Sequence, residues 1–100
     1  MSQNVFADIG MPNPDTEFIK AQIVYQISQL IQAKGLTQRE IAEQLGIDQP
    51  KVSALLRGQW EGYSIERLIR FVNRLHRDVT IVIGDKDTTD REAKTQVITG

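Results

Sequence analysis

The sequence TQREIAEQLGIDQPKVSALLR, from Thr37 to Arg57, decides the fold. Read at a helical period, its apolar residues fall into two groups, one before a turn and one after it: Ile41, Ala42 and Leu45, then Val52, Leu55 and Leu56. Gly46 lies between the groups, where a left-handed conformation would end the first helix and reverse the chain. Asp48 can cap the second helix, and Pro50 falls in its first turn, where the missing N–H breaks no bond. The stretch therefore predicts two short helices joined by a tight turn.

Two helices joined in this way form a helix-turn-helix, whose second helix lies in the major groove of DNA. Ala42 is small at the point where two steeply crossing helices would touch. A helical hairpin without a role in nucleic-acid binding is the alternative, because short motifs also match by chance. The spacing favours the DNA-binding interpretation.

Helical patterns also flank this motif. Asn13-Pro14-Asp15 has the residues of a helix start, and apolar residues at helical spacing follow it until Gly35. Ser64 can cap a further helix that runs to about His76. The apolar stripe expected on that helix consists of Ile65, Leu68, Ile69, Val72 and Leu75. In the loop before it, Trp60 and Tyr63 either cover an edge of the core or contact the DNA sugar-phosphate.

Charge is unevenly distributed, although the formal net charge is only −1. Residues 34 to 77 carry eight Lys or Arg against five acids, for +3, whereas residues 1 to 33 and 78 to 100 each stand at −2. A basic centre suits DNA binding, because phosphate contacts supply much of the affinity. Within this centre four arginines gather on one side of the last expected helix: Arg67, Arg70, Arg74 and Arg77. The row indicates a nucleic-acid or acidic partner, or a face that is simply solvated.

Residues 78 to 83, DVTIVI, change the period from helical to alternating, which predicts a β-strand. A single strand cannot satisfy its own hydrogen bonds, and the chain offers only weak partners such as Val97-Ile98. Pairing with the same strand of a second copy solves this, so we expect a homodimer that uses Val79, Ile81 and Ile83. Residues 1 to 12 then form an N-terminal arm, residues 13 to 83 the domain, and residues 84 to 100 a polar tail.

Composition narrows the class of protein. One hundred residues with 40% hydrophobic content suffice for one small domain. The chain has no cysteine and only one histidine, so we expect neither a disulfide nor a metal site, and no cofactor. We also expect no enzyme, because the sequence contains no spaced acid-base pair, activated nucleophile or phosphate-cradling glycine loop. Without a recognisable signal peptide or apolar span, a cytoplasmic protein that does not contact membranes is expected.

The motif resembles the DNA-binding motif of the Cro/Xre repressor family, in which Gln38 opens the motif and Ile47 is a core position. The resemblance widens over roughly residues 4 to 83, where the segments VFADIG, LTQREIAEQLGIDQPKVSALLRG, SIERLIRFVNRL and DVTIVI are similar to the HigA-like antitoxins that accompany RelE/HigB-type toxins. It implies a mainly α, lambda-repressor-like domain of four to five helices with a C-terminal β-strand used in dimer pairing. It also implies a repressor of its own toxin-antitoxin operon, with a palindromic operator in double-stranded DNA and a RelE/HigB-type toxin as partners.

The resemblance assigns roles by matched position. The residues at base edges are Gln49, Lys51 and Ser53, with Ala54 near them. Gln38, Arg39 and Arg57 are implied to hold backbone phosphates, and the helix start at Ser64 can receive a further phosphate. Pro50 departs from the pattern, because it removes one backbone donor near the phosphates. A protein-interaction module that binds a toxin or other partner without itself reading DNA is the alternative function.

Overall fold

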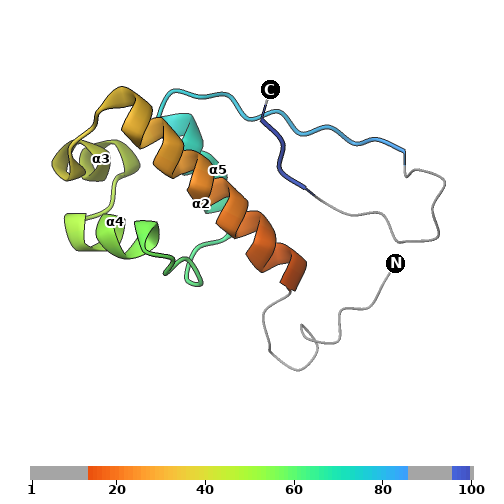
Figure 1. Cartoon of the computed structure of the whole chain (residues 1–100), viewed down its shortest axis with the longest axis horizontal. Coiled ribbons are helices and arrows are strands. Elements are labelled where there is room, and N and C mark those ends of the chain that lie inside the picture. Colours follow the sequence, from red (N-terminus) through yellow and green to blue (C-terminus); the bar gives the residue numbers. More distant parts are fainter. Residues whose placement is uncertain (1–13, 86–95, 100) are drawn as a thin grey trace.

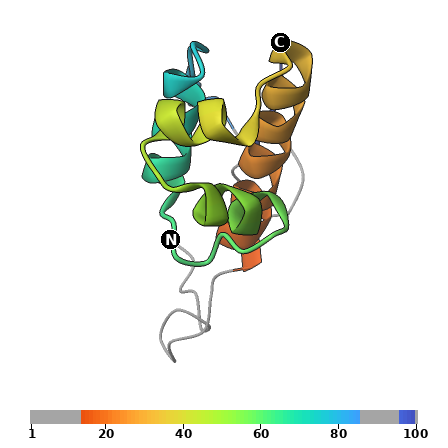
Figure 2. The same ribbon diagram turned by 90° about the vertical axis from the view of Figure 1, so that its left-hand side faces the viewer.

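The computed structural model describes residues 14–85 and 96–99. They contain four helices, which are α2 (Pro14–Lys34), α3 (Gln38–Leu45), α4 (Gln49–Leu56) and α5 (Ile65–Arg74). Helix α5 packs mainly along α2, and α3 packs against α4 (Figure 1). The α3–α4 pair lies on the left-hand side of Figure 1, which faces the viewer in Figure 2. The long helix α2 and helix α5 therefore support the pair from behind.

All four helices contribute to one core. Its least exposed large side chains, each below 2% exposure, are Ile27, Ile41, Val52, Leu55, Leu68 and Leu75. Burying one such side chain stabilises the fold by about 1.5–3 kcal/mol. Phe71 is also buried, at 3% exposure, although it was missing from the apolar stripe expected on this helix. The core therefore fixes how α3 and α4 sit on the two supporting helices.

The short helices begin and end where the sequence predicted. Gly46 has a φ of 73° and ends α3, while the Asp48 carboxylate caps α4 by accepting a hydrogen bond from the Lys51 N–H at 3.1 Å. The Ser64 hydroxyl caps α5 by accepting from the Arg67 N–H at 3.1 Å. Helix α5 is shorter than expected, because it ends at Arg74 and His76 takes a left-handed conformation with φ 67°.

The prediction of a β-strand at residues 78–83 is wrong for the single chain. Residues 78–83 form neither helix nor strand, and no strand occurs within the ranges 14–85 and 96–99. Ile81, Val82 and Ile83 are 77%, 80% and 94% exposed along this extended segment. A β-strand requires backbone hydrogen bonds to a neighbouring strand, and among the residues that the structure describes no strand lies beside residues 78–83.

The structure describes only part of the two ends of the chain. The expected N-terminal arm, residues 1 to 12, lies outside the described residues, as does most of the expected polar tail. Within the described part of the tail, Val97 packs against the core and lines a shallow groove on α2 with Ala21, Gln22, Tyr25 and Gln26. This contact connects the end of the chain with the long helix.

Candidate nucleic-acid interface

The first turn of α4 is an exposed tip. Asp48, Gln49 and Lys51 are exposed, whereas Val52 and Leu55 are completely buried. The start of α4 points to the left in Figure 1, away from α2 and α5. A helix held by its inner face with a free first turn has the geometry needed to enter the major groove.

The four residues expected at base edges divide into two pairs. Gln49 and Lys51 are exposed, and neither side chain has a hydrogen bond or ion pair to any other described residue. Ser53 and Ala54 are half-buried one turn further along. The Ser53 hydroxyl accepts a hydrogen bond from Nη1 of Arg57 at 2.6 Å. Gln49 and Lys51 therefore form the free part of the tip, while Ser53 already contacts an arginine.

The residues expected at phosphates come from three helix ends. Gln38 and Arg39 are exposed as the first two residues of α3, and Arg57 follows the last residue of α4. Ser64 is exposed at the start of α5. Its oxygen accepts the capping hydrogen bond, so its hydroxyl hydrogen remains able to donate to a phosphate. In Figure 2, α3 starts on the side of α2 and α5 lies on the opposite side, with α4 below α3.

Comparisons with known proteins agree with this geometry. Residues 5–84 match the model of a family described as a helix-turn-helix domain. A solved structure that carries the name of an XRE-family transcriptional regulator is 37% identical, with a TM-score of 0.83. The match covers 89% of this chain and 100% of that one. The chain belongs to the XRE family of helix-turn-helix transcriptional regulators.

Membership of the XRE family makes DNA binding and transcription regulation the function class of the protein, and the family is typically not enzymatic. Neither matched name mentions a toxin or an antitoxin. No curated protein matches the chain. The expectation of a mainly α, helix-turn-helix domain like that of XRE-family regulators is thus confirmed, whereas the antitoxin role is a separate question.

The aromatic loop of this XRE-family regulator belongs to the core. Trp60 and Tyr63 are half-buried and pack against core residues. The Tyr63 ring meets the Phe71 ring edge-on, with centroids 5.6 Å apart and an angle of 65° between the planes. Such pairs stabilise beyond their area burial. Of the two interpretations offered for these aromatic residues, covering the core edge is the one that the contacts support.

A capping box orients the start of α3 in the regulator. The Thr37 hydroxyl accepts from the Glu40 N–H at 3.2 Å, and the Glu40 carboxylate accepts from the Thr37 N–H at 2.9 Å. The Thr37 backbone first, and then its side chain, hold the pKa of Glu40 below its ordinary value of 4.5. The sequence carries the signal for this box, Thr-x-x-Glu, which the expectations from periodicity did not include. It fixes the helix start on which Gln38 and Arg39 lie.

The described residues contain neither a membrane-spanning helix nor a cluster of metal ligands. No helix in the described part of the chain is long and apolar enough to cross a membrane. Among those same residues, no three His, Cys, Asp or Glu side chains come together in a group that could hold a metal ion.

Proposed function

We propose that this XRE-family regulator is a sequence-specific repressor that reads a palindromic operator with the first turn of α4. One observation carries the proposal: Gln49 and Lys51 are exposed and free on a helix whose opposite side is completely buried at Val52 and Leu55. A glutamine amide can pair bidentately with adenine, and a lysine can donate to guanine. Ser53 and Ala54, one turn further along, lie at the edge of the same contact.

Around this tip, phosphate contacts position the regulator without reading sequence. Gln38 and Arg39 contact one strand from the start of α3, and Ser64 contacts another phosphate from the start of α5. Arg57 contributes its charge from the end of α4, where its hydrogen bond to Ser53 holds the guanidinium beside the same helix. An arginine held in this way loses less conformational entropy when it binds a phosphate.

The operator is bound by a homodimer. Support comes from the extended segment 78–83, whose alternating side chains Val79, Ile81 and Ile83 are exposed at 39%, 77% and 94%. Pairing two such segments across a two-fold axis would bury these side chains and give each segment its missing hydrogen bonds. The dimer then presents two α4 tips to half-sites one turn of DNA apart, which is about 34–36 Å.

An antitoxin role is the finer part of the proposal, and it rests on the similarity of GIDQPKVSALLRG and the flanking segments to HigA-like antitoxins. The regulator would then repress its own operon and neutralise a RelE/HigB-type toxin in the cytoplasm. Expression of any short reading frame that adjoins that of the regulator, alone and together with the regulator, tests this role. We expect growth arrest in the first case and normal growth in the second, and normal growth in both cases would remove the antitoxin role.

Two substitutions test the assignment of reading and positioning residues. Gln49→Ala should lower the preference for the operator over unrelated DNA by about 1–3 kcal/mol, because one bidentate base contact is lost. Arg57→Ala should instead weaken binding to all DNA alike and reduce the dependence of affinity on salt. Fluorescence anisotropy with operator and scrambled duplexes, each at several salt concentrations, separates the two effects.

If neither substitution changes binding to a palindrome that the wild type holds, these role assignments fail. A gel shift with the DNA upstream of the protein's own reading frame tests the wider proposal. Failure to shift any such fragment at low salt would favour a protein-interaction module that does not read DNA.

A further inference from the structure

Three arginines of α5 face the turn of the helix-turn-helix across a cleft. Arg67, Arg70 and Arg74 line it together with Ser64, and the turn closes the other side through Leu45 and Gly46. The cleft has a volume of ≈ 290 Å³. Because Gly46 is only two residues before the cap of α4, the cleft opens beside the α4 tip. The fourth arginine of the row, at position 77, does not line it.

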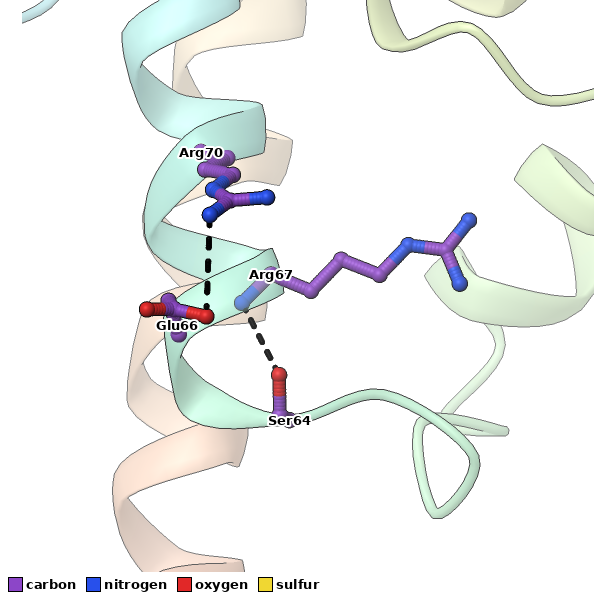
Figure 3. Close-up of polar contacts among 4 residues, drawn as sticks. All are labelled: Ser64, Glu66, Arg67 and Arg70. Carbon is purple, nitrogen blue, oxygen red and sulfur yellow. Dashed lines mark hydrogen bonds and ion pairs between the residues drawn. The ribbon is translucent and has the colours of Figure 1, made fainter.

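The positive charge in this cleft is only partly neutralised. Nη2 of Arg70 lies 3.7 Å from Oε1 of Glu66, and both side chains are largely exposed, at 69% and 79% (Figure 3). Within the described residues no carboxylate lies at ion-pair distance from Arg67 or Arg74. Exposed ion pairs are weak, so Glu66 is readily exchanged for another anion. Three guanidinium groups thus stand against one carboxylate.

Arg67 and Arg74 are held in position by contacts that leave their charge unpaired. The Arg67 guanidinium carbon lies 5.0 Å from the centroid of the Tyr63 ring and 5.7 Å from that of Phe71. Figure 3 shows the Arg67 side chain projecting away from α5. Nη1 of Arg74 donates to the carbonyl oxygen of Leu45 at 3.5 Å. Each guanidinium retains further N–H donors, and such planar groups fit phosphate oxygens well.

The spacing of the arginines suits a DNA strand. At 1.5 Å per residue, Arg67 and Arg74 are about 10 Å apart along α5. Because each strand of duplex DNA carries a phosphate at every nucleotide, a row of this length reaches more than one phosphate of the strand. The Ser64 hydroxyl adds a donor at the end of the same row. An acidic peptide carries negative charge as a DNA strand does, but the position of the cleft beside the base-reading tip favours a nucleic-acid backbone.

We propose that Arg67, Arg70 and Arg74 form an arginine track that binds successive phosphates of one DNA strand beside the half-site read by α4. The inference rests on the proposed function. It adds three residues to the DNA-binding surface, and these contact phosphates and read no base. The track raises the affinity for every DNA sequence alike, and it fixes the angle at which the α4 tip enters the groove.

Charge removal on the track tests the proposal. Arg67→Gln and Arg70→Gln should each lower the affinity for operator and unrelated DNA about three- to tenfold near 0.15 M salt. Each should also reduce the slope of log K against log salt by about 1. Arg74 is left intact, because its contact with the Leu45 carbonyl gives it a structural role. Fluorescence anisotropy over a salt series measures both quantities, and circular dichroism checks that the variants are folded.

The matched control is Arg77→Gln, which removes the same charge next to the same helix but outside the cleft. We expect its salt slope to stay close to that of the wild type. A second measurement locates the contact by replacing single phosphates of the operator with neutral methylphosphonates. At a phosphate that the track binds, this replacement should lower the affinity of the wild type. The affinity of the Arg67→Gln/Arg70→Gln double variant should not fall any further at that phosphate.

The outcomes separate the track from the proposed function. Wild-type affinity and salt slope in both track variants would overturn the track and leave the operator assignment standing, as would an equal effect of Arg77→Gln. Equal losses for wild type and double variant at every neutral phosphate would also overturn it, and would point to an acidic protein partner. If the wild type itself binds no DNA from its own upstream region, the proposed function fails and the track fails with it.

Discussion

At the scale of single residues, the reciprocal hydrogen bonds of Thr37 and Glu40 make the start of α3 sensitive to acid. The pKa of the Glu40 carboxylate is lowered in the folded protein, so the folded state binds this proton less tightly than the unfolded chain. The stability that the carboxylate contributes is therefore present above its unfolded pKa of about 4.5, and it is lost as the pH falls through the lower, folded value. We expect Glu40→Gln, which retains an acceptor oxygen and does not titrate, to remove this part of the pH dependence.

Urea unfolding of wild type and Glu40→Gln over a series from neutral to acid pH measures the effect. Parallel profiles for the two proteins would contradict it. Thr37→Ala is the companion variant, because it removes the hydroxyl acceptor of the same box and should cost about 0.5–2 kcal/mol at neutral pH.

Local spacing explains which polar contacts the sequence could reveal. Asp48 and Ser64 were predicted as caps, and each accepts from the amide three residues further on. The contact between Arg74 and the Leu45 carbonyl joins residues 29 positions apart. Helical periodicity placed the arginines on one side of α5, but it gave no information on the turn they face. That neighbour depends on how α5 packs against α3, which only the folded core determines.

At the scale of elements, two glycines with similar backbone conformations should differ in how much their substitution by alanine destabilises the fold. Gly35 has a φ of 64° with nothing within 4 Å of an added Cβ, so Gly35→Ala should cost only the backbone strain of about 1–2 kcal/mol. At Gly46, with φ 73°, the added Cβ would lie 2.7 Å from Nη1 of Arg74. Gly46→Ala should cost only slightly more, because the flexible end of the Arg74 side chain must move away and loses its long contact with the Leu45 carbonyl. Urea denaturation measures both free energies of unfolding.

The control is to repeat both substitutions in an Arg74→Gln background, where the extra cost of Gly46→Ala should shrink. An extra cost that stays the same in that background would show that the arginine is not its source.

The four helices and the missing strand differ in what a sequence can determine. A helix forms its hydrogen bonds within its own segment, so the apolar period and the caps were enough to predict α2 to α5. Residues 78–83 have an equally clear alternating pattern, yet a strand depends on a second strand outside the segment. Phe71 was missed in the prediction of the core, because α5 is buried over a wider arc than the expected five-residue stripe covers. Local patterns thus predicted the helices well, whereas a strand could not be predicted from its own segment alone.

At the scale of the whole molecule, one chain leaves much apolar surface uncovered. Phe18 and Tyr25 on α2 are 63% and 59% exposed, and Ile98 is 79% exposed. The extended segment adds Ile81 and Ile83 to this set. A monomeric protein can expose single apolar side chains, but a segment of alternating apolar residues with unpaired backbone groups is typical of an interface. This surface lies outside the α4 tip, so pairing through it leaves both tips accessible.

Ile81→Asp should therefore convert the proposed homodimer into a monomer, because a carboxylate in the centre of the paired segments would have to be buried without a partner. Sedimentation velocity measures the mass, and Thr80→Asp on the other side of the same segment is the control that should remain dimeric. On a duplex with one half-site, Ile81→Asp and wild type should bind alike. On the full palindrome the variant should bind more weakly, since it loses the high effective concentration of the second tip. An Ile81→Asp protein that stays dimeric and holds the palindrome as tightly as wild type would exclude this segment as the dimer contact, and another surface would then have to set the spacing of the two tips.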